Sequence, residues 1–302
     1  MTPRHISRRS FHSLLGLGAA AHWVRADAPA RKIRIGHTGI TWGNNSSQAI
    51  KDVASLGFYG FETFGNVLEK WAADAELDGL LAEYKLPLIS GYCTLDLVDP
   101  SKRAGELARM MAWGKLIQKY GGSVSVLGPN GVPRASYDFK AAKANIIETL
   151  NECGKMLTDA GLTPVLHQHT GTCIETRDEV YAVLDAVDTK SVKFGPDIGQ
   201  LQKGGSDPVQ VVKDYLPLVH HMHLKDYDGG PAYQGYCPLG RGKVDIPAIL
   251  DMVEKANMQG RIMVELDPSR GMPIAAGETA AIAKAYLEKL GYKFRTQGGT
   301  EK

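Results

Sequence analysis

Four strand-like segments in the second half of the chain each end in a side chain that can bind a metal ion or transfer a proton. The segments are rich in apolar and β-branched residues and span residues 163–169, 192–197, 219–226 and 261–267. The side chains near their carboxyl ends include His167, Asp197, His223 and Glu265. Neutral imidazole and carboxylate groups together suit Zn, Mn, Fe or Co. The pattern therefore predicts one divalent metal site with these four residues as ligands.

Two further residues share the orientation of these ligands. Because side chains alternate along a strand, His169 points the same way as the ligand two residues before it, and so does Lys225. Both are expected one layer above the ligands and nearer to a substrate. The neighbouring pair His220 and His221 is interpreted as packing residues or as support for the ligands.

Each predicted ligand also has a purely structural interpretation. A single buried histidine in a strand is more often a hydrogen-bonded core residue than a ligand. Asp197 could cap a turn, and Glu265 could form an ion pair with Lys225 or Arg270. The metal site is favoured because all four residues fall at the ends of consecutive predicted strands, an arrangement that is rare by chance.

The rest of the chain supplies the elements that must position these residues. Strands are predicted at residues 32–37, 58–63, 86–92 and 123–127, ahead of the four segments above. Helices are predicted at residues 46–56, 72–84, 103–120, 139–160, 177–187, 208–215, 246–256 and 276–290. Eight β-α units in about 270 residues indicate an α/β fold, the (β/α)8 or TIM barrel. An open doubly wound sheet usually carries a glycine fingerprint after its first strand, and none follows Ile35.

In a barrel, the carboxyl ends of all strands meet at one mouth, where a substrate binds. The first two strands bring His37, Trp42 and Glu62 to this mouth. The loop at residues 227–242 is rich in Gly, Tyr and Pro and is expected to cover the mouth, although an ordinary surface loop is an alternative. We predict substrate contacts from His37, Trp42 and Arg241.

The first 28 residues are expected to be an export signal of the twin-arginine type. Arg8 and Arg9 form an adjacent arginine pair, residues 14–21 are weakly apolar, and residues 26–28 offer a small-residue cleavage site. An ordinary amphipathic helix is the alternative. We therefore expect a periplasmic or otherwise exported protein with one domain, residues 29–294, and a flexible tail over residues 295–302.

The charge balance excludes an extended basic surface. The chain of 302 residues carries 35 Lys and Arg against 33 Asp and Glu. Four of the basic residues precede Asp27, so the remainder has 31 basic residues against the same 33 acidic ones. Nucleic acid and membranes are therefore not expected partners, and no apolar run of about 18 residues predicts a membrane span. The four cysteines lack a C-x-x-C spacing and are interpreted as buried thiols.

Taken in order, the short motifs of the chain resemble those of a known superfamily. They are Gly57-Phe-Tyr-Gly-Phe-Glu62, His167-x-His169-x-Gly171-Thr172, Asp197-x-Gly199, His223-x-Lys225-Asp226, Pro238-Leu-Gly-x-Gly242-x-x-Asp245 and Val264-Glu265. The set is similar to that of the xylose-isomerase-like barrel superfamily of sugar isomerases and epimerases, especially its inosose dehydratase-like members. The resemblance implies a (β/α)8 barrel with a divalent metal, commonly Mn, Co, Zn or Mg. It also implies Asp197, His223 and Glu265 as ligands and Glu62 near the substrate.

Two positions depart from the pattern of this superfamily. Its epimerases usually have Glu where His167 stands, and that Glu works with the one at Glu265 to move protons on opposite faces of the substrate. Many relatives also have D-x-G-H where this chain has Asp197-Ile-Gly-Gln200. Gln200 is therefore expected to bind substrate as a neutral hydrogen-bonding group. Metal-assisted enolisation remains expected, whereas two-glutamate epimerisation loses one of its two bases.

The predicted reaction is enolisation of a ketone that has a neighbouring hydroxyl group. A metal that binds both oxygens polarises the carbonyl and stabilises the enediolate formed when the adjacent carbon loses its proton. The candidate proton-transferring residues are Glu265, Lys225, His169 and Glu62. We predict a sugar isomerase/epimerase or a dehydratase/lyase acting on a small carbohydrate: a keto-sugar, keto-inositol or keto-glycoside. The oligomeric state stays open, a homo-oligomer included.

Two other functions remain alternatives. One is a non-catalytic sugar-binding protein in which aromatic residues stack on a sugar ring, namely Trp42, Tyr92, Tyr227 and Tyr236. The other is metal-dependent hydrolysis of a phosphodiester, which requires additional metal ions and a basic groove.

Overall fold

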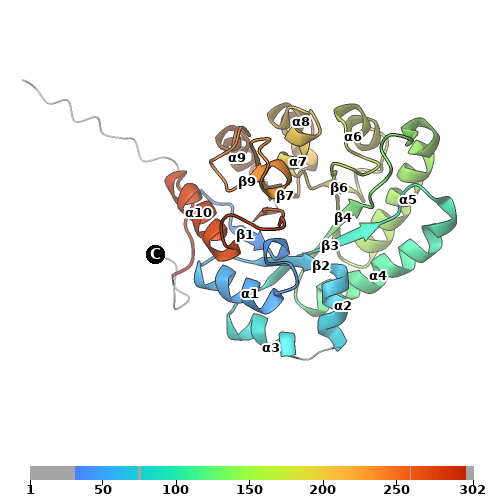
Figure 1. Cartoon of the computed structure of the whole chain (residues 1–302). Helices are drawn as coiled ribbons and strands as arrows, with labels where there is room; N and C mark the ends of the chain where they lie inside the picture. The colour runs from blue at the N-terminus through green and yellow to red at the C-terminus, as the bar shows by residue number, and fades with distance from the viewer. Residues whose placement is uncertain (1–30, 74–75, 259, 297–302) are drawn as a thin grey trace, which may run out of the picture. The chain divides into compact units, whose positions relative to one another are not determined.

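Eight parallel strands form the centre of the molecule (Figure 1). The computed structural model describes residues 31–73, 76–258 and 260–296, so the export signal predicted at residues 1–28 lies outside the described residues. The strands are β1 (Ile35–Thr38), β2 (Phe61–Phe64), β3 (Leu88–Leu95), β4 (Val124–Pro129), β5 (Thr163–Leu166), β6 (Lys193–Phe194), β7 (His221–Leu224) and β10 (Arg261–Val264). Ladders join them in the order β6-β5-β4-β3-β2-β1-β10-β7. Parallel bridges from Phe194 to Val219 and from Asp197 to His223 connect β6 to β7, and the predicted (β/α)8 barrel is confirmed.

Helices cover the outside of this barrel (Figure 1). They are α1 (Ser46–Ser55), α2 (Gly65–Ala73), α3 (Glu76–Glu83), α4 (Arg103–Lys119), α5 (Phe139–Asp159), α6 (Arg177–Leu184), α7 (Ile198–Lys203), α8 (Pro208–Asp214), α9 (Ile246–Lys255) and α10 (Ala276–Lys289). In α5, Ile146, Leu150, Cys153 and Leu157 are buried. This spacing follows the helical period, and it gives the helix an apolar stripe that packs on the sheet. The layer between strands and helices is the main core.

Two helical regions differ from the prediction. The single helix predicted at residues 72–84 is two helices, α2 and α3, and α2 begins directly after β2. Gly65 permits this early start, because a Cβ there would lie 2.3 Å from the Trp113 ring. The short helix α7 is absent from the prediction. Asp197 caps it, since Oδ1 of Asp197 accepts a hydrogen bond from the backbone N–H of Gln200 at 3.0 Å.

The strands are shorter than their apolar segments, and this determines where the polar residues lie. The ladders of β5 and β10 end one residue before His167 and Glu265, respectively. His223 lies within β7, and Asp197 follows β6 as the cap of α7. All four residues therefore reach the same end of the barrel, as parallel strands require.

The inside of the barrel is apolar at one level and polar at the next. Val124, Val126 and Val165 form a small buried cluster that packs against Tyr92. Beyond it, polar side chains fill the barrel, each no more than 1% exposed: Glu62, Ser90, His167, His221 and His223. Polar groups buried at this density need hydrogen-bond partners or a ligand. The polar level is therefore where a functional site is expected.

Two predictions about the whole chain are addressed by the described residues. None of their helices is long and apolar enough to cross a membrane. Cys93, Cys153, Cys173 and Cys237 are buried and free, as predicted.

Candidate metal centre and substrate pocket

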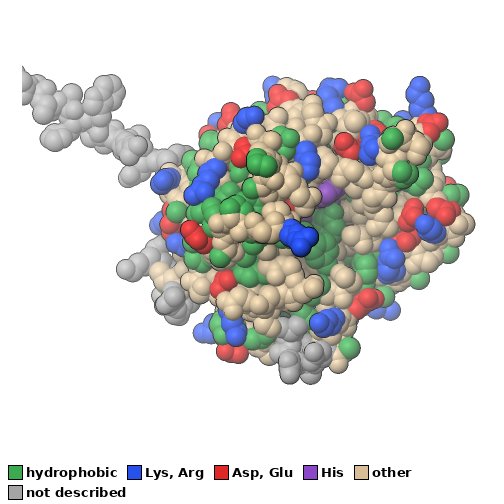
Figure 2. All heavy atoms as spheres, in the orientation of Figure 1, with side chains coloured by type: hydrophobic (Ala, Val, Ile, Leu, Met, Phe, Trp, Pro, Cys, Tyr) green, Lys and Arg blue, Asp and Glu red, His purple; other side chains and the backbone are tan. Residues whose placement is uncertain are grey.

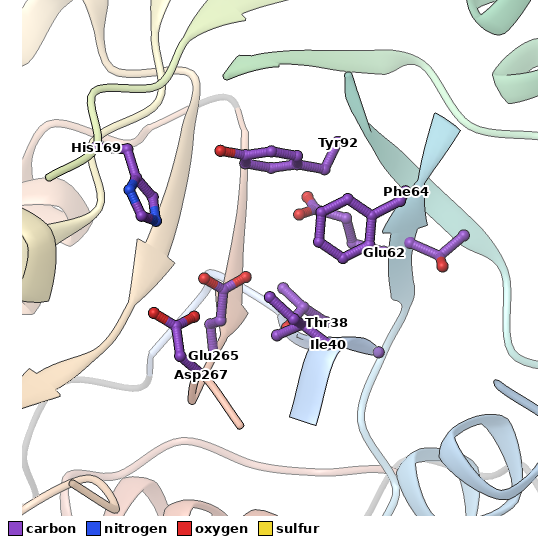
Figure 3. Close-up of a pocket in the computed structure, with 10 residues that line it drawn as sticks. Thr38, Ile40, Glu62, Phe64, Tyr92, His169, Glu265 and Asp267 are labelled. Atoms are coloured by element: carbon purple, nitrogen blue, oxygen red, sulfur yellow. The ribbon is translucent and has the colours of Figure 1, made fainter. Parts of the chain in front are cut away.

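A pocket opens at the carboxyl ends of β1, β2, β3 and β10. Figure 2 shows this hollow, with apolar side chains and a histidine inside it. His169, Glu265 and Asp267 line one side, and Phe64 lies opposite them next to Tyr92 (Figure 3). A pocket with one polar and one apolar wall is typical of a site for a small organic molecule.

Three of the four predicted ligands come together beside this pocket. Ligand atoms of His167, Asp197 and His223 all lie within 4.8 Å of one another, and each side chain is fully buried. Nδ1 of His167 lies 3.1 Å from the carbonyl oxygen of Gly195, so Nδ1 carries the hydrogen and Nε2 carries the lone pair. Nε2 of His167 has no hydrogen-bond partner among the described residues. The donor set and this unpartnered nitrogen fit a divalent cation.

His167 is held in the form that a metal ion requires. Burial and the neighbouring His223 hold the pKa of His167 well below 6.5, so the ring is neutral. On Asp197, Oδ1 caps α7, and Oδ2 has no hydrogen-bond partner among the described residues and lies beside Nζ of Lys225, where it remains for a ligand. The expectation that Asp197 caps a turn and the expectation that it binds metal therefore use different oxygens of one carboxylate.

His223 is shared between two carboxylates. Its Nε2 lies 2.7 Å from Oε1 of Glu62, and its Nδ1 lies 3.2 Å from Oε2 of Glu265. Burial alone would lower the pKa of His223, but Glu265 and Glu62 outweigh burial and hold it well above 6.5. A proton and a metal ion compete for the same ring nitrogen, so a bound cation would replace one ring proton.

Glu62 lines the pocket and also contacts two histidines beneath it. Its Oε2 lies 2.8 Å from Nε2 of His221 and accepts a hydrogen bond from the hydroxyl of Ser90 at 2.5 Å. Burial would raise the pKa of Glu62, but the facing His223 and the hydrogen bonds from both histidines hold it far below its usual value. A carboxylate held in this way is a weak base. This environment does not favour the predicted role of Glu62 in proton transfer.

Glu62, His221 and His223 also satisfy the distance requirement for a metal site. However, their closest atoms are only 2.7 and 2.8 Å apart, which is hydrogen-bond length. Ligands at about 2.0 to 2.1 Å from a tetrahedral ion lie roughly 3.3 Å from each other. Contacts this short leave no space for an ion between Glu62 and either histidine, so this group supports His223 from below.

Lys225 is fully buried and is surrounded by carboxylates. Its Nζ lies 2.8 Å from Oδ2 of Asp197, 2.7 Å from Oε1 of Glu265 and 3.0 Å from Oδ1 of Asp267. Burial would lower the pKa of Lys225, but these carboxylates raise it well above 10.5. Lys225 is therefore an ammonium that can donate a proton but not accept one, which argues against the predicted role as a base. The alternative ion pair between Glu265 and Lys225 is present.

Glu265 connects the cation group to the pocket. Burial would raise the pKa of this carboxyl group, but His223 and Lys225 hold it well below 4.5. Glu265 lies against His223 and lines the pocket, where its second oxygen contacts Lys225. As the fourth predicted ligand it is adjacent to the group of three, and its carboxylate is ionised and able to bind a cation.

His169 lines the pocket as an imidazole with a defined tautomer. Its Nδ1 lies 2.7 Å from the carbonyl oxygen of Thr170, and its Nε2 lies 2.7 Å from Nε2 of Gln200. Oε1 of Gln200 accepts the Thr170 hydroxyl at 2.7 Å, so the amide nitrogen of Gln200 faces the ring. Gln200 therefore donates to Nε2 of His169. Gln200 is buried and is not among the residues that line the pocket, where a substrate-binding group was expected.

Three predicted substrate-binding residues lie away from the pocket. His37 packs against the rings of Trp42 and Phe58, and burial lowers its pKa from 6.5 to about 4. The indole N–H of Trp42 donates to Asp52 of α1 at 2.7 Å. Arg241 is exposed. The structure does not bring these side chains into the pocket.

Asp267 and the apolar wall are site residues that the prediction omitted. Asp267 follows Glu265 by two residues, and strand alternation, which located His169 and Lys225, could have located it as well. Phe64 directly follows the polar end of β2 and had no polar signal of its own. Tyr92, expected only in the sugar-binding alternative, does line the pocket.

The loop after β7 is anchored rather than loose. The carboxylate of Asp226 accepts hydrogen bonds from the backbone N–H groups of Gly240, Gly242 and Val244. A Cβ on Gly242 would lie 2.1 Å from Oδ1 of Asp226, so the loop needs glycine there. In this loop Tyr236 is buried, and its ring lies 4.7 Å from Nζ of Lys225. No residue of this loop is among those that line the pocket, so its covering role stays a prediction.

Solved structures of other proteins share this fold. The IOLI protein with a bound zinc atom superposes with a TM-score of 0.72 at 16% identity, covering 87% of this chain and 99% of that one. The 3-keto-D-glucoside 4-epimerase YcjR from E. coli superposes with a TM-score of 0.67 at 18% identity, covering 86% and 99%.

Sequence comparison also finds relatives along most of the chain. The inosose dehydratase of Clostridium botulinum (strain Alaska E43 / Type E3) is 25% identical over 297 residues, which cover 85% of this chain and 97% of that relative. The inosose dehydratase of Geobacillus kaustophilus (strain HTA426) is 23% identical over 296 residues, which cover 85% and 94%. A sequence model of the xylose isomerase-like TIM barrel family matches residues 50–290. Since this match spans most of the barrel described above, the chain belongs to the xylose isomerase-like TIM barrel family.

Proposed function

We propose that this protein is a divalent-metal-dependent enzyme that removes a proton beside the ketone of a small carbohydrate. The observation that carries the proposal is the buried group of His167, Asp197 and His223 next to a pocket lined by His169 and Glu265. The names of similar proteins, inosose dehydratase and 3-keto-D-glucoside 4-epimerase, support a keto-inositol, keto-sugar or keto-glycoside as substrate.

Four side chains would hold the cation, namely His167, Asp197, His223 and Glu265. When bound, Zn, Mn, Co or Mg supplies Lewis-acid polarisation of a carbonyl group. Backbone groups fix two of these ligands in place, because Gly195 accepts from His167 and Gln200 donates to Asp197. Such contacts orient the ligands and strengthen metal binding.

His169 is the residue that we assign to proton transfer. It lines the pocket, and its Nε2 faces the amide nitrogen of Gln200 rather than a charged group. When the Gln200 amide turns away or shares this nitrogen, the lone pair can accept a proton from the substrate carbon. The fixed charges on Glu62 and Lys225 make both less suitable. Glu265 remains a cation ligand.

Proton removal leads to dehydration or to isomerisation. In dehydration, the C–H bond beside the ketone and the C–O bond of the β-hydroxyl break, a C=C bond forms, and water leaves. In epimerisation, a proton returns on the opposite face, which requires a second proton carrier. In isomerisation, a proton returns at a different carbon, and the same base can deliver it on the same face. His167 is neutral and buried without a pocket contact, so it does not supply the second carrier. We therefore place dehydration ahead of epimerisation.

The test is solvent-hydrogen exchange beside the ketone, followed by NMR in D₂O with an inosose and a 3-keto-glucoside as substrates. The protein loaded with Zn, Mn or Co is expected to exchange this hydrogen and then form product. A His169→Gln variant is expected to be about 100-fold slower. The matched control is His220→Gln, since His220 lies at the opposite end of the barrel near Arg261. Exchange at wild-type rate in His169→Gln would remove His169 from the mechanism, and no exchange with any metal would reject enolisation.

We also propose that the protein is exported through the twin-arginine route, on the basis of Arg8 and Arg9 and the small-residue cleavage site near Asp27. Replacing both arginines by lysine is expected to leave the unprocessed chain in the cytoplasm. Cell fractionation with immunoblotting would detect the change, and unaltered export of this variant would contradict the proposal.

A further inference from the structure

The ammonium of Lys225 and the proposed divalent cation need the same carboxylates. Nζ lies 2.8 Å from Oδ2 of Asp197 and 2.7 Å from Oε1 of Glu265. Both carboxylates are among the four proposed ligands, and Oδ2 is the Asp197 oxygen not used to cap α7. An ammonium and a divalent ion therefore compete for the same carboxylate oxygens.

Lys225 has little freedom to leave this place. Its stem packs on α7, where a Cβ on Gly199 would lie 2.7 Å from Cγ of Lys225. The ring of Tyr236 lies 4.7 Å from Nζ on another side. The ammonium is therefore confined to the space among its carboxylate partners, and any shift must end at one of them.

Asp267 is the carboxylate that can still pair with Lys225 when the cation binds Asp197 and Glu265. Its Oδ1 lies 3.0 Å from Nζ, and it is not among the residues that hold the cation.

We propose that Lys225 is a built-in competitor that sets the affinity for the metal. In the metal-free protein, its ammonium pairs with Asp197 and Glu265 and holds them in place. When the cation binds these two carboxylates, the ammonium stays paired with Asp267. This inference rests on the proposed metal site. It adds that the lysine weakens metal binding while it stabilises the metal-free protein, and that Asp267 reduces this competition.

The test measures metal affinity and stability rather than activity. Isothermal titration with Zn²⁺ and with Mn²⁺ gives the dissociation constant, and thermal unfolding in EDTA gives the stability of the metal-free protein. Lys225→Met is expected to bind metal at least tenfold more tightly and to melt at a lower temperature in EDTA. Asp267→Asn is expected to bind metal several-fold more weakly. The matched control is Lys203→Met, because Nζ of Lys203 also lies 4.7 Å from the Tyr236 ring but donates to the carbonyl of Gln234.

A double-mutant cycle separates competition from simple charge removal. If Asp267 acts through Lys225, the effect of Asp267→Asn on metal affinity shrinks to less than half in the Lys225→Met background. If Asp267 acts only by its own charge, the effect on metal affinity is equal in both backgrounds, and competition by Lys225 is rejected. Should Lys225→Met fail to fold, Lys225→Gln carries the same expectation, because it keeps a hydrogen-bond donor without the charge.

The remaining outcomes distinguish this inference from the proposed function. Unchanged or weaker metal binding by a folded Lys225→Met variant would overturn the competition, while the metal-dependent function would stand. Binding by Lys225→Met but not by the wild type would support the competition and reject metal dependence of the natural chain. Binding by neither would overturn both.

Discussion

Two polar groups share His223 inside the barrel, and they differ in how closely their members approach one another. Below His223, Glu62 contacts two histidines and Ser90, and each of these contacts has hydrogen-bond length. Above it, the ligand atoms of His167, Asp197 and His223 lie within 4.8 Å of one another, and Nε2 of His167 has no partner among the described residues. Short contacts between buried polar groups hold them together without a ligand, whereas the wider group leaves space for one. The difference separates the support of the site from the site itself.

The largest expected effect comes from Asp197→Ala, which removes a ligand from the upper group. We expect metal binding to be lost and catalysis to fall about 1000-fold, since a Lewis acid contributes several kcal/mol. Metal titration and steady-state kinetics on the same preparation would measure both. The folded state should persist, and near-normal turnover in this variant would place the cation elsewhere.

Glu62→Gln tests the lower group and should reduce stability more than it reduces metal affinity. Two buried histidines would lose their charged partner, which costs about 3 kcal/mol in the free energy of unfolding. Urea unfolding in EDTA would measure this loss, while metal affinity is expected to change less than in Asp197→Ala. A variant that keeps its stability but loses the metal would reverse the assignment of support and site.

His37 tests burial where aromatic rings surround a histidine. The folded protein keeps His37 neutral because burial lowers its pKa from 6.5 to about 4. The unfolded chain binds this proton below pH 6.5, so stability is fully present above pH 6.5 and is lost as pH falls toward 4. The loss is about 3 kcal/mol at most, and urea unfolding across this pH range should show less of it in His37→Phe. An identical pH profile for that variant would assign the loss to other groups.

Ser90→Ala is expected to have the smallest effect. It removes one hydrogen bond to Glu62, whose two histidine contacts remain, so about 1 kcal/mol of stability is expected to be lost. Chemical denaturation would measure it beside Ser136→Ala, a matched control in an exposed loop. A loss as large as that of Glu62→Gln would mean that the lower group is cooperative and cannot be apportioned residue by residue.

The sequence predicted the barrel and the meeting of His167, Asp197 and His223 for one physical reason. Parallel strands bring their carboxyl ends together, and apolar periodicity locates those ends to within a few residues. Helices with a strong apolar stripe, such as α5 and α9, were located well for the same reason.

The parts that the sequence did not predict depend on side-chain direction and length. Strand order cannot show that Trp42 turns to Asp52 on α1, or that Arg241 stays exposed. Nor can it show that the long side chain of Lys225 reaches three carboxylates and loses the ability to act as a base. Helix α7 has only six residues, too few for a periodic signal.

The double use of Asp197 makes α7 a reporter of the site. Its Oδ1 binds the amide of Gln200, and its backbone carbonyl accepts from the amide of Leu201. A ligand that immobilises Oδ2 would slow the opening of this first helical turn. The exchange of these two amide hydrogens with deuterated water, followed by mass spectrometry, would then register occupancy of the barrel mouth without any substrate present.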